Sequence, residues 1–199
     1  MNIMTNIDIY PIFSSFLINQ KLDLDTKAIR NWIEREYHKD LHTDYEINLH
    51  LKEEALKDFY FRTNYILDNV HNALGFSKNT KQQIQKAWVN VDCNKKTSVS
   101  VPHVHASADY ICVYYPYVED GSGILELMNP NSSVEYVFPS AQPSIIESYN
   151  IFNSRIWKIV PENDSLVIFP SWLIHYVRPG NPNTTRMSIA LNSKIITNV

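Results

Sequence analysis

A change of periodicity near residue 85 constrains the fold of this chain more than any other feature of its sequence. Before that point, apolar residues recur three or four apart over residues 25–37 and 53–74, as they do in amphipathic helices. A first strand is expected over residues 7–18, and a polar connector over residues 77–85. After the connector, short β-type segments alternate with turn residues. The pattern predicts an α+β, mainly β protein, in which two helices precede a β-barrel or sandwich.

The segments expected to be strands are rich in β-branched and aromatic residues and are bounded by Gly, Pro, Asn or Ser. They cover residues 87–92, 109–117, 123–128, 133–138, 156–160, 165–169 and 186–193. A chain of 199 residues fits one domain with a sizeable core. We therefore expect a single domain over residues 1–199, with the first strand and the helices in 1–84 and the β core in 85–199.

The last expected strand has one polar or small face and one apolar face. The polar face carries Arg186, Ser188, Ala190 and Asn192, and the apolar face carries Met187, Ile189 and Leu191. We place the N-terminal helices against the apolar face, which turns Arg186 toward the barrel interior. A buried arginine is costly unless it meets an anion, so this placement favours an acidic ligand. The simpler alternative is a surface salt bridge from Arg186 to Asp164 or Glu162.

Three histidines have the spacing of a metal site. His103 and His105 follow Pro102 two residues apart, so on an extended chain both imidazoles project to the same side. His175 follows an apolar strand that ends near Pro170. Neutral imidazole is a good ligand for iron, copper, zinc or nickel. A chance pair of histidines at a strand edge, together with a hydrogen-bonded core His175, is the alternative interpretation.

Charge and cysteine content narrow the class of protein. The formal net charge is −3, and no basic block or basic and aromatic stripe is present, so nucleic acid is not an expected partner. The first twenty residues lack the basic lead and long apolar run of a signal peptide or membrane span. Cys93 and Cys112 have no CxxC spacing and indicate neither a disulfide framework nor a thiolate zinc site. These features favour a reducing, cytoplasmic location without membrane contact.

Several short segments together resemble the 2-oxoglutarate/Fe(II)-dependent oxygenases, in particular their prolyl-hydroxylase-like branch and a bacterial and phage family of oxygenases. The resemblance covers about residues 85–193 and lies in 87–91, 102–105, 113–115, 121–123, 169–172 with His175, and 186–189. It implies a double-stranded β-helix, or jelly roll, with N-terminal helices packed on one sheet. It also implies Fe(II) as the metal, 2-oxoglutarate as the cosubstrate and dioxygen as the oxidant.

Carried over by position, the resemblance assigns His103 and His175 to the first and last places of the facial triad of metal ligands. The second place, where the family has a carboxylate, is occupied here by His105. Three ligand sets therefore stay open: three histidines, a set completed by Asp109, and a two-histidine site beside His105. We favour the three-histidine set because it needs no shift in register, and we expect Asp109 to be a turn residue or to support a ligand.

The resemblance also assigns the cosubstrate site. Arg186 matches the basic residue that pairs with the far carboxylate of 2-oxoglutarate, which suits a guanidinium fork. Tyr115 matches a tyrosine that hydrogen-bonds the same carboxylate, and Tyr114 takes its place if the register shifts by one. Asn90 is expected to help position the cosubstrate, with a buried structural amide as the alternative.

The function implied is a dioxygenase that hydroxylates a prolyl or other peptidyl residue, a free amino acid or a small metabolite, with a protein substrate ranked slightly first. Two alternatives from other classes stay open. One is a cupin-like metalloenzyme that does not use 2-oxoglutarate, and the other is a non-catalytic jelly-roll binding or virion protein. The expected partners are the substrate and, as an open possibility, a second copy of the chain in a homodimer.

Overall fold

The computed structural model describes residues 10–12, 15–36, 45–46, 54–93, 100–131 and 146–197, and in these it places two helices and nine strands. The chain is therefore mainly β, as predicted. In order, the elements are β1 (Ile18–Lys21), α1 (Thr26–Glu36), β2 (Tyr45–Glu46), α2 (Glu54–Ala73), β3 (Thr80–Asp92), β4 (Tyr110–Val118), β5 (Ile124–Met128), β6 (Ile156–Ile159), β7 (Ser165–Pro170), β8 (His175–Arg178) and β9 (Arg186–Thr197).

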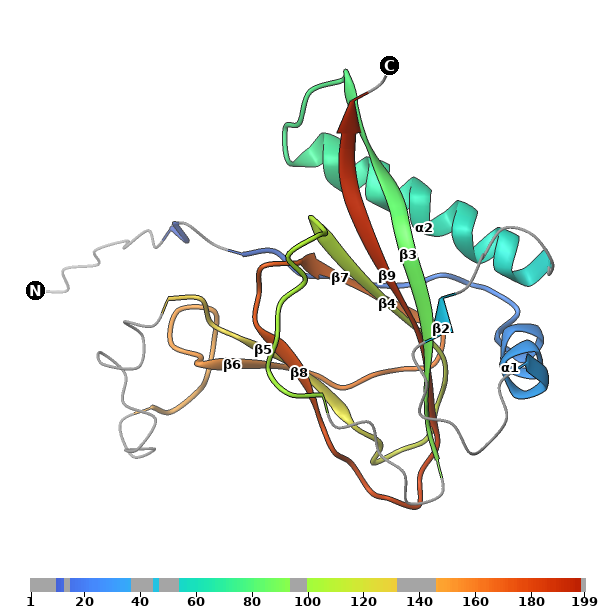
Figure 1. Ribbon diagram of the computed structural model, residues 1–199. Coiled ribbons are helices and arrows are strands. Elements are labelled where there is room, and N and C mark those ends of the chain that lie inside the picture. The colour runs from blue at the N-terminus through green and yellow to red at the C-terminus, as the bar shows by residue number, and fades with distance from the viewer. Residues whose placement is uncertain are drawn as a thin grey trace, which may run out of the picture.

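The strands form two antiparallel sheets (Figure 1). The larger sheet has the order β1-β7-β4-β9-β3-β2, and the smaller one has the order β6-β5-β8. An isolated antiparallel bridge joins His103 to His175 in β8, so the segment before β4 continues the small sheet at its edge. This bridge brings together two histidines that are far apart in the sequence.

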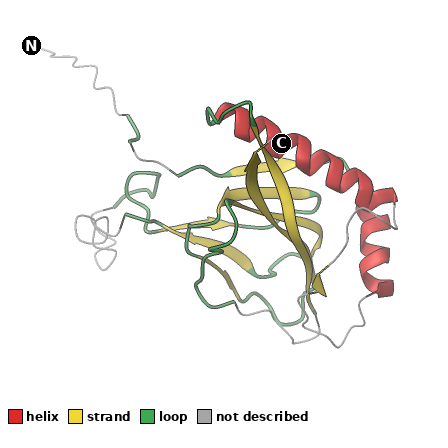
Figure 2. Cartoon of the chain, turned by 45° about the horizontal axis from the view of Figure 1, so that its top comes forward, coloured by secondary structure: helices red, strands yellow, loops and turns green. Residues whose placement is uncertain are grey.

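Alternate residues of the large sheet serve two separate cores. In β4, Cys112 and Tyr114 pack toward the helices, whereas Ile111 and Tyr115 pack toward the small sheet. The helices bury Ile29, Phe59 and other apolar residues of their inner faces against the first group. Figure 2 shows both helices on one side of the strands. The predicted packing of N-terminal helices on one sheet is thereby confirmed, and the opposite face of that sheet is left for the interior.

Several strands differ from their predicted limits, beginning with the first one. The first strand was expected over residues 7–18, but β1 begins at Ile18, and residues 10–12 and 15–17 are not in a strand; residues 7–9, 13 and 14 lie outside the described part. The four residues of β1 pair with β7 from Ile18↔Ile168 to Lys21↔Ser165, so the position of β7 decides where the strand forms. β-branched composition alone does not carry that information.

The polar connector expected over residues 77–85 is in fact largely strand, because β3 begins at Thr80. Its first residues pair with the end of β9, from Thr80↔Thr197 onward, with an irregularity between Ile84 and Lys86. Both β3 and β9 extend beyond the predicted limits, and the short strands β2 and β8 were not predicted at all. The strand expected over residues 133–138 lies outside the described residues. Strands that carry polar residues on both faces lack the alternation from which they are recognised.

Two turns of the barrel pack so closely that one of them requires glycine. A Cβ atom built on Gly180 would lie 2.3 Å from the backbone carbon of Ser122 and 2.4 Å from the carbonyl oxygen of Gly121. The neighbouring amide of Asn181 donates to the Gly121 carbonyl at 2.7 Å. The turn between β8 and β9 is therefore locked against the turn between β4 and β5.

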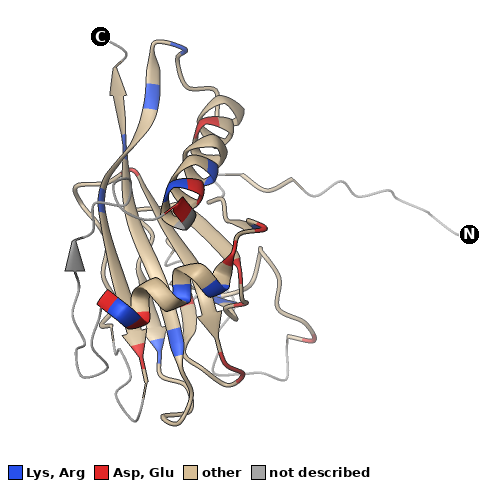
Figure 3. Cartoon of the chain, turned by 90° about the vertical axis from the view of Figure 1, so that its right-hand side faces the viewer, with Lys and Arg blue, Asp and Glu red and all other residues tan. Residues whose placement is uncertain are grey.

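The helix-covered side carries charges of both signs. Figure 3 shows Lys and Arg residues interspersed with Asp and Glu residues along the helices. Arg30 of α1 forms an ion pair with Glu34 at 2.9 Å, and its guanidinium lies 3.7 Å from the ring centre of Tyr117. None of the helices that the structure describes is long and apolar enough to cross a membrane.

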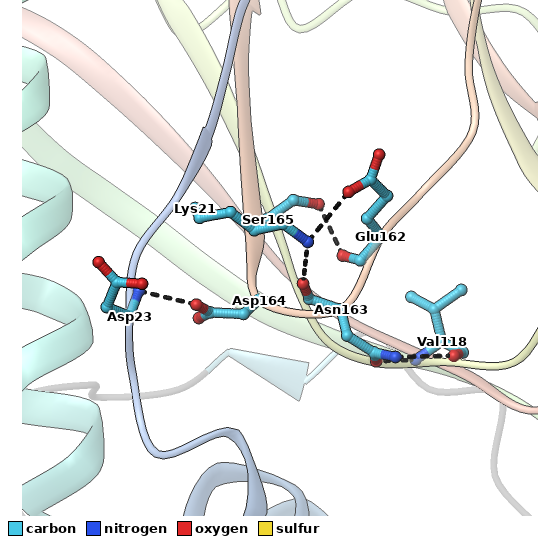
Figure 4. A network of polar contacts seen from close by, with 7 residues as sticks. All are labelled: Lys21, Asp23, Val118, Glu162, Asn163, Asp164 and Ser165. Atoms are coloured by element: carbon cyan, nitrogen blue, oxygen red, sulfur yellow. Dashed lines mark hydrogen bonds and ion pairs between the residues drawn. The ribbon is translucent and has the colours of Figure 1, made fainter.

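A turn before β7 fastens the N-terminal segment to the large sheet (Figure 4). The carboxylate of Asp164 accepts hydrogen bonds from the backbone amides of Asp23 at 2.7 Å and Leu24 at 3.3 Å. It also accepts the hydroxyl of Tyr114 at 2.8 Å, and that side chain is fully buried. Asp164 itself has a φ of 63°, a left-handed conformation that Asp and Asn tolerate better than most residues. The Asp164 side chain thus joins the segment between β1 and α1 to β4 of the large sheet.

We expect Asp164→Ala to lower the free energy of unfolding by about 2–4 kcal/mol, because it leaves the Tyr114 hydroxyl buried without an acceptor and removes two further bonds. Asp164→Asn keeps an acceptor oxygen and tolerates the positive φ, so it should lose less than half as much. Urea denaturation of the two variants and the parent checks this expectation. Equal midpoints for Asp164→Ala and the parent would contradict it.

Candidate metal and cosubstrate site

Three histidines from distant parts of the chain meet at one edge of the small sheet. The candidate ligand atoms of His103, His105 and His175 all lie within 4.8 Å of one another. Their ring centres are 4.4–5.1 Å apart. Backbone hydrogen bonds fix this arrangement: His103 and His175 exchange two, at 3.0 and 3.1 Å, and the His105 amide donates to the Ser171 carbonyl at 3.0 Å. Among the described residues, this is the only such group with metal-binding geometry.

Each imidazole is held through its Nδ1 atom. The Nδ1 of His103 lies 2.7 Å from the Val101 carbonyl, and that of His175 lies 2.8 Å from the Leu173 carbonyl. The Nδ1 of His105 lies 2.8 Å from the side-chain oxygen Oδ1 of Asn192. Carbonyl oxygens only accept, so each Nδ1 donates a proton to its partner, and in the neutral form of the ring Nε2 keeps a free lone pair. This is the arrangement by which proteins fix the tautomer and orientation of metal-binding histidines.

The surroundings favour the neutral form of His175 and His105. Burial lowers the pKa of His175 to about 4, with a further lowering from the neighbouring histidines. Burial also lowers the pKa of His105, and His103 and Lys86 act in the same direction. Trp88 stacks on His105 with the ring planes 18° apart, and Phe169 contacts His175 edge-on. Neutral imidazoles with free Nε2 atoms are the form that binds a metal.

Asp109, the alternative ligand, is engaged elsewhere. Its Oδ2 atom accepts the backbone amide of Ile195 at 2.6 Å, and its own amide donates to the Ser193 carbonyl at 2.8 Å. It is not part of the histidine group. Asp109 thus ties the start of β4 to β9.

The histidines open onto a cavity of about 390 Å³ between the two sheets. Its walls come from the inward-facing residues of β3, β4, β5, β8 and β9, including Ile111, Val113 and Leu125. The predicted cosubstrate residues Arg186, Tyr115 and Asn90 line the same cavity. The structure therefore brings all six predicted site residues to one cavity.

Arg186 lies buried against a carboxylate that the sequence reasoning missed. Its Nη2 atom is 2.7 Å and its Nε atom 2.9 Å from Oδ2 of Asp92, which is directly opposite it in the β3–β9 ladder. The residues considered as surface partners, Asp164 and Glu162, do not take this role, so that alternative was wrong. Asp92 is two residues after Asn90 and shares its face of the strand, a signal that could have identified it.

Of the two adjacent tyrosines, the one that lines the cavity is Tyr115. Tyr114 points the other way, toward the helices, where its ring centre lies 4.8 Å from that of Phe59. Burial raises the pKa of Tyr115 to about 12, Arg186 lowers it and Asp92 raises it. Tyr115 is thus a protonated phenol at neutral pH, able to donate a hydrogen bond to an anion.

Two polar residues of β9 complete the inner surface. Ser188 accepts a hydrogen bond of 3.4 Å from the Asn90 amide, and Asn192 holds His105 as described above. Both lie on the polar face predicted from the alternation in this strand. The alternation placed them inside, but it did not indicate which residues they contact.

The family model described as "Putative 2OG-Fe(II) oxygenase" matches residues 86–192, more than half of the chain. No curated protein sequence matches the chain.

Solved structures with the same fold include oxygenases of several kinds. A prolyl-4-hydroxylase from Pseudomonas putida is similar with a TM-score of 0.58 and 12% identity, over 89% of this chain and 87% of that one. A viral collagen prolyl hydroxylase from Paramecium bursaria Chlorella virus-1 has a TM-score of 0.56 and 11% identity, over 98% and 99% of the two chains. HygX from Streptomyces hygroscopicus, with nickel and 2-oxoglutarate bound, has a TM-score of 0.57 and 10% identity, over 90% and 82%.

Proposed function

The chain belongs to the family of 2-oxoglutarate- and Fe(II)-dependent oxygenases, and from this premise we propose that it hydroxylates a peptidyl residue at a site built by His103, His105 and His175. The observation that carries the proposal is the convergence of three Nδ1-anchored imidazoles on the cavity that also contains Arg186. The fold is the double-stranded β-helix of this family.

The donor set fits iron. Three imidazoles that can present their Nε2 atoms suit Fe(II), and a set of only three protein ligands would leave room for further ligands. When bound there, iron with 2-oxoglutarate and dioxygen supplies the oxidising chemistry of the reaction. His103, His105 and His175 would hold the metal, and the carbonyls of Val101 and Leu173 and the side chain of Asn192 would keep the rings oriented.

The cosubstrate has a matching anchor inside the cavity. Arg186 offers a guanidinium to the far carboxylate of 2-oxoglutarate, and the protonated Tyr115 can donate a hydrogen bond to the same group. Asn90 and Ser188 line the wall beside them. The apolar side chains of Ile111, Val113 and Leu125 line the same cavity.

A peptidyl substrate is favoured by the surface beside the metal site. Trp157 of β6 pairs with Leu127 of β5, which in turn pairs with His175 of β8. Residues paired in this way face the same side of a sheet, so Trp157 lies on the cavity side, two strands or about 10 Å from His175. Its side chain is 42% exposed. The distance between Trp157 and His175 corresponds to about three residues of an extended chain, so a peptide is long enough to contact both this ring and the metal, whereas a free amino acid is too short.

The Pseudomonas and viral proteins with this fold are prolyl hydroxylases, which makes a proline-containing peptide the first substrate to test. With Fe(II), 2-oxoglutarate and air, we expect such peptides to stimulate 2-oxoglutarate consumption and to gain one oxygen atom, measured by mass spectrometry. Free proline is the control. Coupled turnover with free amino acids and none with any peptide would contradict a peptidyl substrate.

A further inference from the structure

The contact between Asp92 and Arg186 uses one particular edge of the guanidinium. A guanidinium can grip a carboxylate along its side edge, formed by Nε–H and Nη2–H, or along its end edge, formed by Nη1–H and Nη2–H. Both contacts to Asp92, at 2.9 and 2.7 Å, come from Nε and Nη2. The side edge of Arg186 is therefore occupied by the carboxylate of Asp92. Among the described residues, Asp92 is the one that accepts hydrogen bonds from this guanidinium.

Asp92 also cancels the charge at this end of the cavity. The two side chains are 2% and 6% exposed, so water screens their interaction little. The third buried group beside them, Tyr115, is a neutral phenol. A second carboxylate that binds the end edge of Arg186 would lie only a few ångströms from Asp92, and like charges at that distance repel in a buried site.

We propose that Asp92 is a positioning residue that turns the end edge of Arg186 toward the cosubstrate and weakens the binding of its far carboxylate. This inference rests on the proposed function, since it concerns the strength with which the same cavity holds 2-oxoglutarate. Asp92 would thereby affect selectivity. It reduces the factor by which the site binds a 2-oxoacid with two carboxylates more tightly than one with a single carboxylate. An arginine without this partner would bind the dicarboxylate more tightly.

The test compares two five-carbon acids, 2-oxoglutarate and 2-oxopentanoate, which lacks the second carboxylate. Asp92→Asn keeps an oxygen acceptor for Arg186 but removes the negative charge. We expect it to bind 2-oxoglutarate about tenfold more tightly than the parent in the Ni²⁺-loaded protein, measured by calorimetry. Binding of 2-oxopentanoate should change less than twofold, because this acid brings no charge to Arg186.

The melting temperature of Asp92→Asn and two further variants separate an effect on binding from an effect on folding. Asp92→Asn leaves a buried arginine without a counter-ion, so the protein free of ligand should melt at a lower temperature and should gain more from 2-oxoglutarate than the parent does. If it cannot be purified, Asp92→Ser, which also removes the charge and keeps an acceptor, tests the same expectation. Asp58→Asn, an exposed position on α2, gives the same change in formal charge and should alter neither affinity.

Two outcomes would overturn the inference while leaving the proposed function in place: an unchanged or weakened affinity of Asp92→Asn for 2-oxoglutarate, and an equal gain in affinity for both acids. A parent protein that is loaded with metal and binds neither acid would contradict the proposed function itself, and the inference with it.

Discussion

Replacing His175 with alanine is expected to weaken iron binding by roughly 100-fold or more, since loss of a group that merely orients a ligand already costs 10- to 100-fold. His175 is the most buried of the three histidines, and its backbone amide and carbonyl both form hydrogen bonds with the backbone of His103. Iron retained after gel filtration, together with 2-oxoglutarate turnover, measures the effect. We expect both to fall to background.

His105→Ala decides which ligand set is used. If His105 binds the metal, this variant should lose iron as His175→Ala does, whereas a supporting residue would leave most of the iron in place. His71→Gln is the matched control, because His71 is a buried histidine that contacts Thr80 and Gln82 away from the cavity. Full iron retention in His175→Ala would contradict the proposed site.

Arg186→Gln is expected to raise the concentration of 2-oxoglutarate needed for half-maximal turnover by about 100-fold, the equivalent of losing a charged, bidentate hydrogen bond in a buried site. Iron binding should persist, because Arg186 is not part of the histidine group. Steady-state kinetics at varied 2-oxoglutarate, with the iron content determined on the same sample, separates the two effects.

The single variant also removes the cation from the buried Asp92–Arg186 ion pair, which costs about 3–5 kcal/mol and could unfold part of the barrel. The double variant Asp92→Asn/Arg186→Gln removes both charges and serves as the control for folding. It should melt closer to the parent and still bind 2-oxoglutarate poorly. Turnover by either variant with an unchanged requirement for 2-oxoglutarate would show that Arg186 is not the anchor.

The parts of the fold that were predictable are those in which one face of an element is apolar. The stripes of α1 and α2 and the alternation from Arg186 to Asn192 led to the correct layers, because burial of an apolar face dictates orientation. The start of β3 was hidden by its polar residues, which pair with β9 beyond the body of the barrel. Such segments are stabilised by pairing with a strand that is distant in the sequence, and this pairing cannot be predicted from the local sequence.

For the candidate site, residue type and spacing led to the histidines, Arg186 and Tyr115, all of which line one cavity. The supporting contacts were not predictable, since the bond between His105 and Asn192 joins residues 87 apart and that between Arg186 and Asp92 joins residues 94 apart. Such contacts depend on strand register, which sequence alone did not provide. Asp92 in particular weakens one argument from the sequence. The buried Arg186 was expected to need an acidic ligand, but the carboxylate of Asp92 already provides a negative charge beside it.

The most direct test of the account is an anaerobic titration of the Fe(II)-loaded protein with 2-oxoglutarate, followed by visible absorption. A 2-oxoacid that chelates iron held by nitrogen ligands gives a weak charge-transfer band, which neither component gives alone. We predict that this band appears and saturates in the parent protein and requires a much higher 2-oxoglutarate concentration in Arg186→Gln. Iron that stays bound in stoichiometric amount while no band develops at any 2-oxoglutarate concentration would contradict the account.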